Sequence, residues 1–404
     1  MDEFRSPESV TDLLCQLIAI PSVNPMGRDL TGPEYYEGRL SDWLVKFFQS
    51  FGAEYERIET APGRANVIAR YDAADAPLTL LLDAHQDTVP VDGMTIPPFE
   101  PRVAEGRIAG RGASDVKGGL AAMLYAFRRL VVERPAGAAS VVMSCTCDEE
   151  STSLGITDLV RYWQEPDGRS RLVATPPDGA VIAEPTGLDV VVAHRGATRF
   201  RIRTAGRACH SSDPSQGVSA IYRMARVVTC LEEYADVLTR TVPPHPRCGG
   251  ATLSVGRIEG GASVNIVPDD CAIEVDRRVI PGEDRQAVLP PIRQFLAERL
   301  DFDVQFETPW LEGPALADDD NHWLAEALLE RVTDVAGPHQ AVGVPYGTHA
   351  SRTAAAGVPS VVFGPGSIAQ AHTKDEYLEV DQLEAAAEVY YRFCAWPPGR
   401  QSRP

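Results

Sequence analysis

Runs that suit strands alternate with amphipathic segments through the first half of the chain. Residues 118–132 place Leu120, Met123, Leu124, Phe127 and Val131 at the three- and four-residue spacing of one helix face. Strand-like runs cover residues 65–70, 78–84, 138–147 and 179–184, and the last two are continuously apolar. Continuous apolar runs are typical of strands that are covered on both faces. The pattern therefore predicts an α/β fold with a largely parallel sheet.

The pattern changes near residue 190, where apolar and polar residues begin to alternate and one face of a strand is expected to be solvated. After this strand, the predicted order is helix, strand, strand, helix and strand, at residues 217–238, 250–258, 270–280, 285–299 and 302–308. This β-α-β-β-α-β order is a split βαβ unit, which forms a compact α+β domain. We expect this domain to span residues 190–309.

Beyond residue 310 the α/β character returns, with a helix at 321–336, a strand at 359–366 and a final helix at 381–395. The α/β domain is therefore expected to comprise residues 1–189 and 310–404, with the α+β domain inserted into it. A length of 404 residues fits two or three domains, because single cores rarely grow beyond about 300 residues.

Composition narrows the class of protein. The net charge of −19 argues against a nucleic-acid partner and against an anionic membrane surface. The first residues show no basic segment followed by an apolar core, and no apolar run approaches the ~18 residues of a membrane helix. The eight cysteines are scattered without paired CxxC spacing, so we interpret them as reduced residues of a cytoplasmic protein.

Candidate metal ligands follow the predicted strands of the α/β domain. In open α/β sheets, functional sites form at the carboxyl ends of strands. The side chains concerned lie in five loops; they are His85, Asp87, Asp115, Glu149, Glu150, Glu184 and His372. Histidine nitrogens and carboxylate oxygens suit zinc or a similar divalent ion, and cobalt or manganese would also accept this set.

Such a set fits a two-metal hydrolase. One carboxylate can bridge two ions that polarise the substrate and acidify a water molecule to a pKa of about 7. A further carboxylate must then accept the proton of that water. Glu149 and Glu150 are adjacent, so one could bind metal while the other serves as the base.

From about residue 10 to residue 395, the chain resembles the di-zinc aminoacylase superfamily, which includes acetylornithine deacetylase, succinyl-diaminopimelate desuccinylase, aminoacylase and glutamate carboxypeptidase. The motifs that carry the resemblance are AHQDTVP, with Ala84 where the family usually has Gly, GRGASDVKGG, DEE, AEPT and AHTKDEY. The resemblance implies a zinc-peptidase-like catalytic domain with an inserted ferredoxin-like domain that serves as a lid and dimerisation domain.

The resemblance also implies a role for each residue of the centre. His85 and Glu184 would hold one zinc ion, Glu150 and His372 the other, and Asp115 would bridge both. Glu149 would be the general base, and Asp87 would orient His85 through its second ring nitrogen.

In the inserted domain, the resemblance implies that His210 stabilises the oxyanion at the site of a partner subunit in a homodimer. Asn265 and Arg278 would contact the substrate, with Arg278 as a clamp for its carboxylate. His349 stands where the family often has Asp, close to the expected substrate pocket, so it is a third candidate for substrate binding.

Ordinary structural roles remain open for several of these residues. Asp115 could cap the helix that follows it, Arg278 could pair with a surface acid, and Asn265 could belong to a turn. His349 could either line the pocket or pack in the core.

The first functional hypothesis is an amidohydrolase that removes an acyl group from an N-acyl amino acid, by attack of a metal-bridging water as in acetylornithine deacetylase. The alternative is a dipeptidase or carboxypeptidase with the same mechanism. A third hypothesis, a non-catalytic binding dimer, would be favoured by a missing ligand or base, and none is missing.

Overall fold

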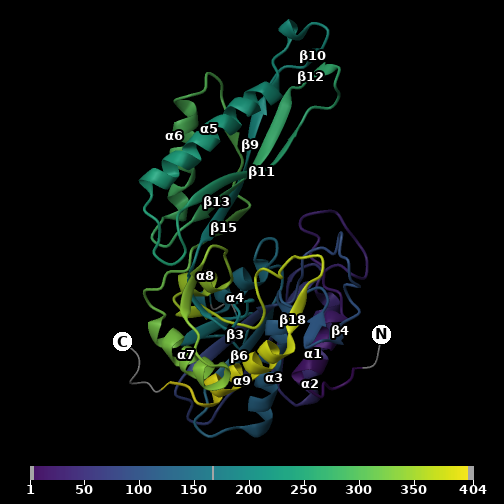
Figure 1. The fold of residues 1–404 in the computed structure, drawn as a ribbon, viewed down its shortest axis with the longest axis vertical. Coiled ribbons are helices and arrows are strands. Elements are labelled where there is room, and N and C mark those ends of the chain that lie inside the picture. The colour runs from purple at the N-terminus through teal and green to yellow at the C-terminus, as the bar shows by residue number, and fades with distance from the viewer. Residues whose placement is uncertain (1–3, 166–167, 399–404) are drawn as a thin grey trace. The chain divides into compact units, whose positions relative to one another are not determined.

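The computed structural model describes residues 4–165 and 168–398 (Figure 1). The chain divides into two compact units. The first unit comprises residues 1–192, 318–342 and 348–404, and the second comprises residues 193–317 and 343–347. The short return of residues 343–347 to the second unit has no counterpart in the hydrophobic pattern.

The first unit is built on a sheet whose described strands run in the order β1-β2-β6-β3-β7-β17-β8-β16. These strands are β1 (Glu54–Ala61), β2 (Arg64–Tyr71), β3 (Thr79–His85), β6 (Ser140–Thr146), β7 (Gly179–Ile182), β8 (Val190–His194), β16 (Ala341–Val344) and β17 (Ser360–Val362). A smaller sheet of this unit contains β4 (Arg102–Ala104), β5 (Arg107–Ala109) and β18 (Tyr377–Glu379).

The main sheet is parallel only at its centre. Strands β6, β3, β7 and β17 are parallel to one another, whereas β1, β2 and β8 pair antiparallel. The prediction of a largely parallel sheet therefore holds for the central strands and is wrong at the edges. The physical reason is visible at β1 and β2, which only Pro62 and Gly63 connect, because so short a loop permits only an antiparallel hairpin.

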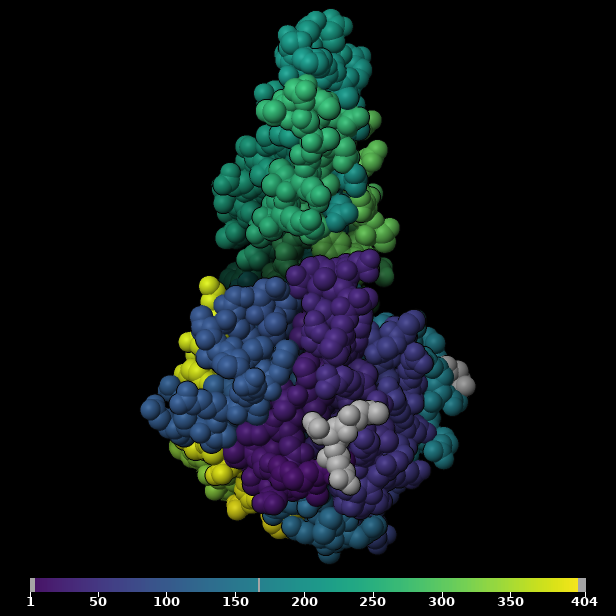
Figure 2. Space-filling view, turned by 90° about the vertical axis from the view of Figure 1, so that its right-hand side faces the viewer, coloured from purple at the N-terminus to yellow at the C-terminus, as the bar shows by residue number. Residues whose placement is uncertain are grey.

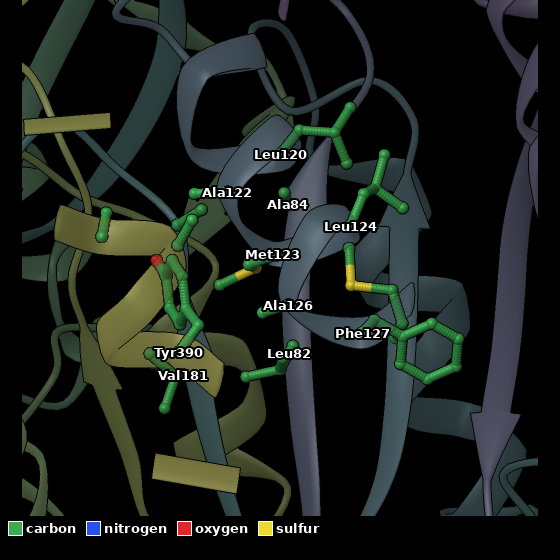
Figure 3. Close-up of a cluster of buried hydrophobic side chains, with 14 of the residues drawn as sticks. Leu82, Ala84, Leu120, Ala122, Met123, Leu124, Ala126, Phe127, Val181 and Tyr390 are labelled. Carbon is green, nitrogen blue, oxygen red and sulfur yellow. The ribbon is translucent and has the colours of Figure 1, made fainter. Parts of the chain in front are cut away.

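Helices cover this sheet and bury its central strands. They are α1 (Val10–Ile18), α2 (Gly38–Ser50), α3 (Lys117–Glu133), α4 (Leu154–Gln164), α7 (His322–Ala336), α8 (Ala350–Ala355) and α9 (Val380–Ala395). Helix α3 packs Met123 and Phe127 into the core together with Leu82 of β3, Val181 of β7 and Tyr390 of α9 (Figure 3). The helix predicted at 118–132 thus lies within one residue of α3 at each end.

The second unit contains an antiparallel sheet in the order β11-β13-β9-β14, with β15 also paired to β9. Its elements are β9 (Gly196–Ala205), β10 (Cys209–His210), α5 (Ala220–Thr241), β11 (Thr252–Gly260), β12 (Ile266–Val267), β13 (Asp270–Val279), α6 (Leu289–Ala297), β14 (Gln305–Phe306) and β15 (Leu311–Gly313). Helices α5 and α6 lie along this sheet (Figure 1). They share one apolar core with it. The order β-α-β-β-α-β and the strand arrangement are those of a ferredoxin-like fold.

Local chemistry explains where the predicted boundaries shift in this unit. Helix α5 begins at Ala220 rather than at 217, because the hydroxyl of Ser219 accepts the backbone N–H of Tyr222 and caps the first turn. The helix predicted at 285–299 is a short 3-10 turn followed by α6, whose first turn contains Pro290. Proline is tolerated there because its missing N–H would have no partner inside the helix.

Among the described residues, no helix is both long and apolar enough to cross a lipid bilayer. All eight cysteines are described, and each is a free thiol.

Candidate metal centre

The carboxyl ends of the central strands bring the predicted ligands together. Strands β6, β3 and β7 are neighbours and run parallel, so the residues that follow them meet at one edge of the sheet. His85 is the last residue of β3, Glu149 and Glu150 follow β6, and Glu184 follows β7. Asp115 lies in the loop that precedes α3.

Two groups of ligand atoms share one carboxylate. The ligand atoms of His85, Asp115 and Glu184 all lie within 4.8 Å of one another, as do those of Asp115, Glu150 and His372. One Asp115 oxygen lies 3.2 Å from His85 Nε2, and the other lies 3.3 Å from His372 Nε2. Asp115 is therefore placed so that each of its two oxygens could serve one ion.

The charge balance of this cluster also suits cations. Burial, with the negative charge of Asp115, raises the pKa of Glu150 to about 8 and raises the pKa of Glu184 well above its usual range. Hydrogen bonds to Asp115 and Glu150 raise the pKa of His372 to about 10. Glu150 Oε1 is buried and has no hydrogen-bond partner among the described residues. Divalent ions would offset this crowded negative charge and give that oxygen a partner.

Asp87 orients His85, but the contacting atom is on its main chain. The Asp87 carbonyl oxygen lies 2.9 Å from His85 Nδ1 and can accept its proton, which leaves Nε2 free to bind metal. The Asp87 carboxylate is farther away, at 3.6 Å. That carboxylate instead accepts the backbone N–H groups of Glu149 and Glu150, both at 3.1 Å.

Glu149 lies beside the ligand cluster and is only partly buried. Desolvation, together with the charges of Asp115 and Asp87, raises the pKa of its carboxyl group, although His85 and His349 act in the opposite direction. A carboxylate beside a candidate metal centre is a candidate for the general base.

His349 is buried next to this cluster. Its Nδ1 lies 2.9 Å from an oxygen of Asp83, whose other oxygen accepts the hydroxyls of Ser144 and Thr146. The rings of His349 and His85 have centroids 6.4 Å apart. Among the described residues, His349 Nε2 has no hydrogen-bond partner. The residue is therefore packed in the core and also borders the site.

The three remaining candidates belong to the second unit. His210 and Asn265 lie close together, because β10 pairs with β12 and the N–H of Ser211 donates to the carbonyl of Asn265 at 3.0 Å. His210 Nδ1 accepts the backbone N–H of Ser212, which leaves the proton of a neutral ring on Nε2. Arg278 lies at the other end of β13 from Asp270 and is paired with Asp276 at 2.7 Å.

Two buried residues that contact the loops of the centre were not predicted. Glu376 is buried, and its carboxylate accepts the N–H groups of Gly112, Ser114 and Asp115 and pairs with Arg111 at 2.7 Å. The only signal in the sequence is its place within AHTKDEY, four residues after the histidine. The second is Asn24, whose side chain donates to the Asp87 carboxylate at 2.8 Å.

The chain is similar to known proteins along most of its length. Residues 81–395 match the model of "Peptidase family M20/M25/M40". An acetylornithine deacetylase of Proteus mirabilis (strain HI4320) is 31% identical over 390 residues, with 94% of each chain covered.

Two solved structures share the fold. A metallo-carboxypeptidase of this family from Sulfolobus solfataricus has a TM-score of 0.75 at 18% identity, with 98% of this chain and 99% of that chain covered. A Bacillus subtilis protein described as a dinuclear metal binding peptidase has a TM-score of 0.67 at 17% identity, with 96% of each chain covered. The chain therefore belongs to peptidase family M20/M25/M40, whose members are metal-dependent hydrolases that act on amide bonds.

Proposed function

We propose that this protein is a di-metal amidohydrolase that removes an acyl group from an N-acyl amino acid, with an acetylornithine-like compound as the first candidate substrate. The observation that carries the proposal is the pair of ligand groups joined by Asp115, with Glu149 beside them. The similarity to an acetylornithine deacetylase along nearly the whole chain supports the choice of a deacylase.

The ligand groups define how two ions would be held. His85 and Glu184 would bind one ion, Glu150 and His372 the other, and Asp115 both. Zinc is our first choice because the donors are imidazole nitrogens and carboxylate oxygens, and cobalt and manganese accept the same set. When bound, two such ions supply polarisation of the substrate carbonyl and acidification of water.

Glu149 supplies the proton transfers. Its carboxylate takes one proton from the attacking water, whose oxygen bonds to the carbonyl carbon of the substrate. The carbon–nitrogen bond then breaks, and Glu149 returns the proton to the leaving amine. The position of Glu149 beside the two ligand groups favours this role.

We assign substrate contacts to four further residues. His210 would donate from Nε2 to the oxyanion at the site of a partner subunit, and its hydrogen bond from Ser212 supports that ring form. Asn265 lies beside His210, and His349 borders His85. Arg278 would bind the substrate carboxylate and would have to exchange its ion pair with Asp276 for it.

The second unit also offers a surface for a homodimer. Strand β11 is the edge strand of its sheet, so one row of its backbone groups is free to pair. Near it, Val264 and Tyr222 are 99% and 78% exposed, and a groove of about 850 Å³ lies between their segments. A fully active protein that sediments only as a monomer would exclude the role of His210 in a partner's site. We also keep the cytoplasmic location as a proposal, which the free thiols support.

The test is amine release from a panel of N-acetyl, N-succinyl and N-formyl amino acids and simple dipeptides. The protein is stripped of metal and reloaded with zinc or cobalt, and Glu149→Gln is the control. One dominant N-acyl amino acid, with less than a thousandth of the activity left in the control, is the expected result. Substantial activity in Glu149→Gln with both ions bound would refute the assignment of the base.

A dipeptidase or carboxypeptidase is the second candidate, because the Sulfolobus structure with the same fold is described as a carboxypeptidase. Cleavage of dipeptides alone would favour it, with the same residues in the same roles. Binding of two ions without cleavage of any compound in the panel would favour the non-catalytic binding dimer.

A further inference from the structure

One side-chain nitrogen joins two buried carboxylates behind the metal centre. Asn24 Nδ2 donates to Asp87 at 2.8 Å and to Asp148 at 2.9 Å. All three residues are buried, with exposed fractions of 1%, 0% and 5%. Because a carboxylate can only accept hydrogen bonds when ionised, the two acids cannot bond to each other and depend on donors from elsewhere.

The position of Asn24 is fixed by its own backbone. The segment from Ser22 to Asn24 runs beside the residues that follow β3: the N–H of Thr88 donates to Ser22 at 3.1 Å, and the N–H of Asn24 donates to Thr88 at 2.8 Å. In Figure 2 the purple N-terminal part of the first unit lies against its blue part. Asn24 Oδ1 accepts the N–H of Met26 at 2.9 Å, which directs the two N–H bonds of Nδ2 towards the acids.

The two acids hold the loop that carries Glu149 and Glu150. Asp87 accepts both of their N–H groups with its carboxylate and holds the ring of His85 with its carbonyl. Asp148 immediately precedes them in that loop. Asn24 therefore links the ends of β3 and β6, which contribute ligands of both groups and the base.

The two carboxylates beside residue 24 favour a neutral hydrogen-bond donor there. Asp87 and Asp148 would repel each other in a dry environment if nothing stood between them. Arg64 pairs with Asp148 and lies 3.7 Å from Glu37, so it balances that side of the network. An Asp at residue 24 would add a further negative charge, and a Leu of similar size would provide no donor.

We infer that Asn24 is a positioning residue for the metal centre, which keeps Glu149 and Glu150 in register with His85 by bridging Asp87 and Asp148. The inference rests on the proposed function, since it takes Glu149 as the base and Glu150 as a ligand. Among the described residues, Asn24 makes no hydrogen bond to a proposed ligand side chain. It acts through Asp87 and Asp148.

The matched control is Asn321. It is also buried in the first unit, and its Nδ2 also donates twice, to the carbonyls of Val192 at 2.8 Å and Ser360 at 2.9 Å. Those acceptors are neutral backbone groups of the sheet. Asn24→Leu and Asn321→Leu thus remove the same group from similar burial, and only the former disturbs the network behind the metal centre.

The experiment measures kcat and KM on the best substrate of the panel, cobalt content, the visible absorption spectrum of the cobalt-loaded protein and the melting temperature. For Asn24→Leu we expect kcat to fall at least 30-fold, with KM within threefold of the original, two cobalt ions and a changed spectrum. For Asn321→Leu we expect a lower melting temperature with kcat within threefold and an unchanged spectrum.

Several outcomes would overturn the inference. One is an Asn24→Leu protein with the original kcat and spectrum, and another is an equal loss of kcat in both variants. If Asn24→Leu does not fold, Asn24→Ser decides, because a hydroxyl keeps one donor: a kcat lowered about fivefold with a shifted spectrum supports the inference, and no change refutes it.

The cobalt spectrum separates this inference from the proposed function, because it needs no turnover. An original protein that binds two cobalt ions but cleaves no amide would refute the proposed function, and the spectra of the two variants would still decide the role of Asn24. An original protein that binds no cobalt would refute both.

Discussion

Asp115 is the residue on which the two ligand groups converge. It is buried, and hydrogen bonds to His372 and His85 hold its pKa below its usual range despite the cost of desolvation. Both imidazoles therefore stabilise the charged form of one carboxylate before any cation is considered. Two metal ions could take the place of the ring protons that His85 and His372 direct at Asp115.

His349 provides a test at the same scale. We expect His349→Asn to raise KM at least tenfold with two metal ions retained, because the variant removes a ring whose Nε2 is buried without a described partner beside His85. Steady-state kinetics and metal analysis check this.

Asp83→Asn serves as the companion variant, since it weakens the bond that orients the ring but leaves the ring in place. A smaller rise in KM is expected for it. If both variants change only the melting temperature, His349 is a packing residue.

The sequence predicted which candidate ligands lie together, but it did not predict which atoms make their contacts. Strand ends and short motifs identify His85, Asp115 and Glu150, because the topology of a parallel sheet brings such positions together. Nothing in a sequence shows that Asp87 acts on His85 through its carbonyl. Asn24 was missed because its partner Asp148 is 124 residues away and no local period connects them.

At the scale of elements, the hydrophobic pattern predicted the long amphipathic helices well, but it did not predict the strands at the edges of the sheets. Helix α3 follows its apolar spacing, whereas β14 is only Gln305–Phe306 where residues 302–308 were expected. Edge strands gain less from burial, so their length depends on partners that a sequence does not show. Helix α1 has nine residues, too short to be stable without the packing it finds against α3.

The loop before α3 is held by Glu376, which lies far along the chain, directly before β18. We expect Glu376→Gln to lower the free energy of unfolding by about 3–5 kcal/mol, because Arg111 would be left buried without its counter-charge. Urea unfolding of the metal-free protein measures this. Glu379→Gln is the control, because its ion pair with Arg107 is exposed to solvent, and exposed pairs contribute little to stability. Equal effects of the two variants would contradict the structural role of Glu376.

Strand β8 ends on a buried histidine, His194, whose pKa is lower than usual. His194 is fully buried, and burial lowers its pKa to about 4, although its bond to the Arg195 carbonyl opposes the shift. Between pH 6.5 and 4, His194 therefore binds a proton in the unfolded chain but not in the folded chain. The stability associated with a neutral His194 is complete above pH 6.5 and is lost as the pH falls to 4, by about 3 kcal/mol.

We expect His194→Gln to show a shallower loss of stability over that range than the original protein, in denaturant titrations at a series of pH values. His322→Gln, at an exposed position, should follow the original curve. Parallel curves for all three proteins would show that His194 does not contribute to the pH dependence.

At the scale of the whole molecule, all proposed ligands lie in the first unit. Metal removal should therefore lower the melting temperature of one transition in calorimetry and leave that of the second unit unchanged. A ligand present at 100 times its dissociation constant stabilises by about 2.7 kcal/mol, so the shift should be several degrees. Restoring zinc should reverse it, and a shift of both transitions by the same amount would show that the units unfold together.

The division of the first unit along the chain has a consequence for its synthesis. His372 and the strands β16 and β17 come after the whole of residues 193–317, so a ribosome completes most of the second unit before the first can close. At about 5–20 residues per second, the interval between Glu184 and His372 lasts some ten to forty seconds. During that time β7 lacks its neighbour β17, and the second ligand group lacks His372. His372, the last of the proposed ligands along the chain, is therefore synthesised only after residues 193–317 of the second unit.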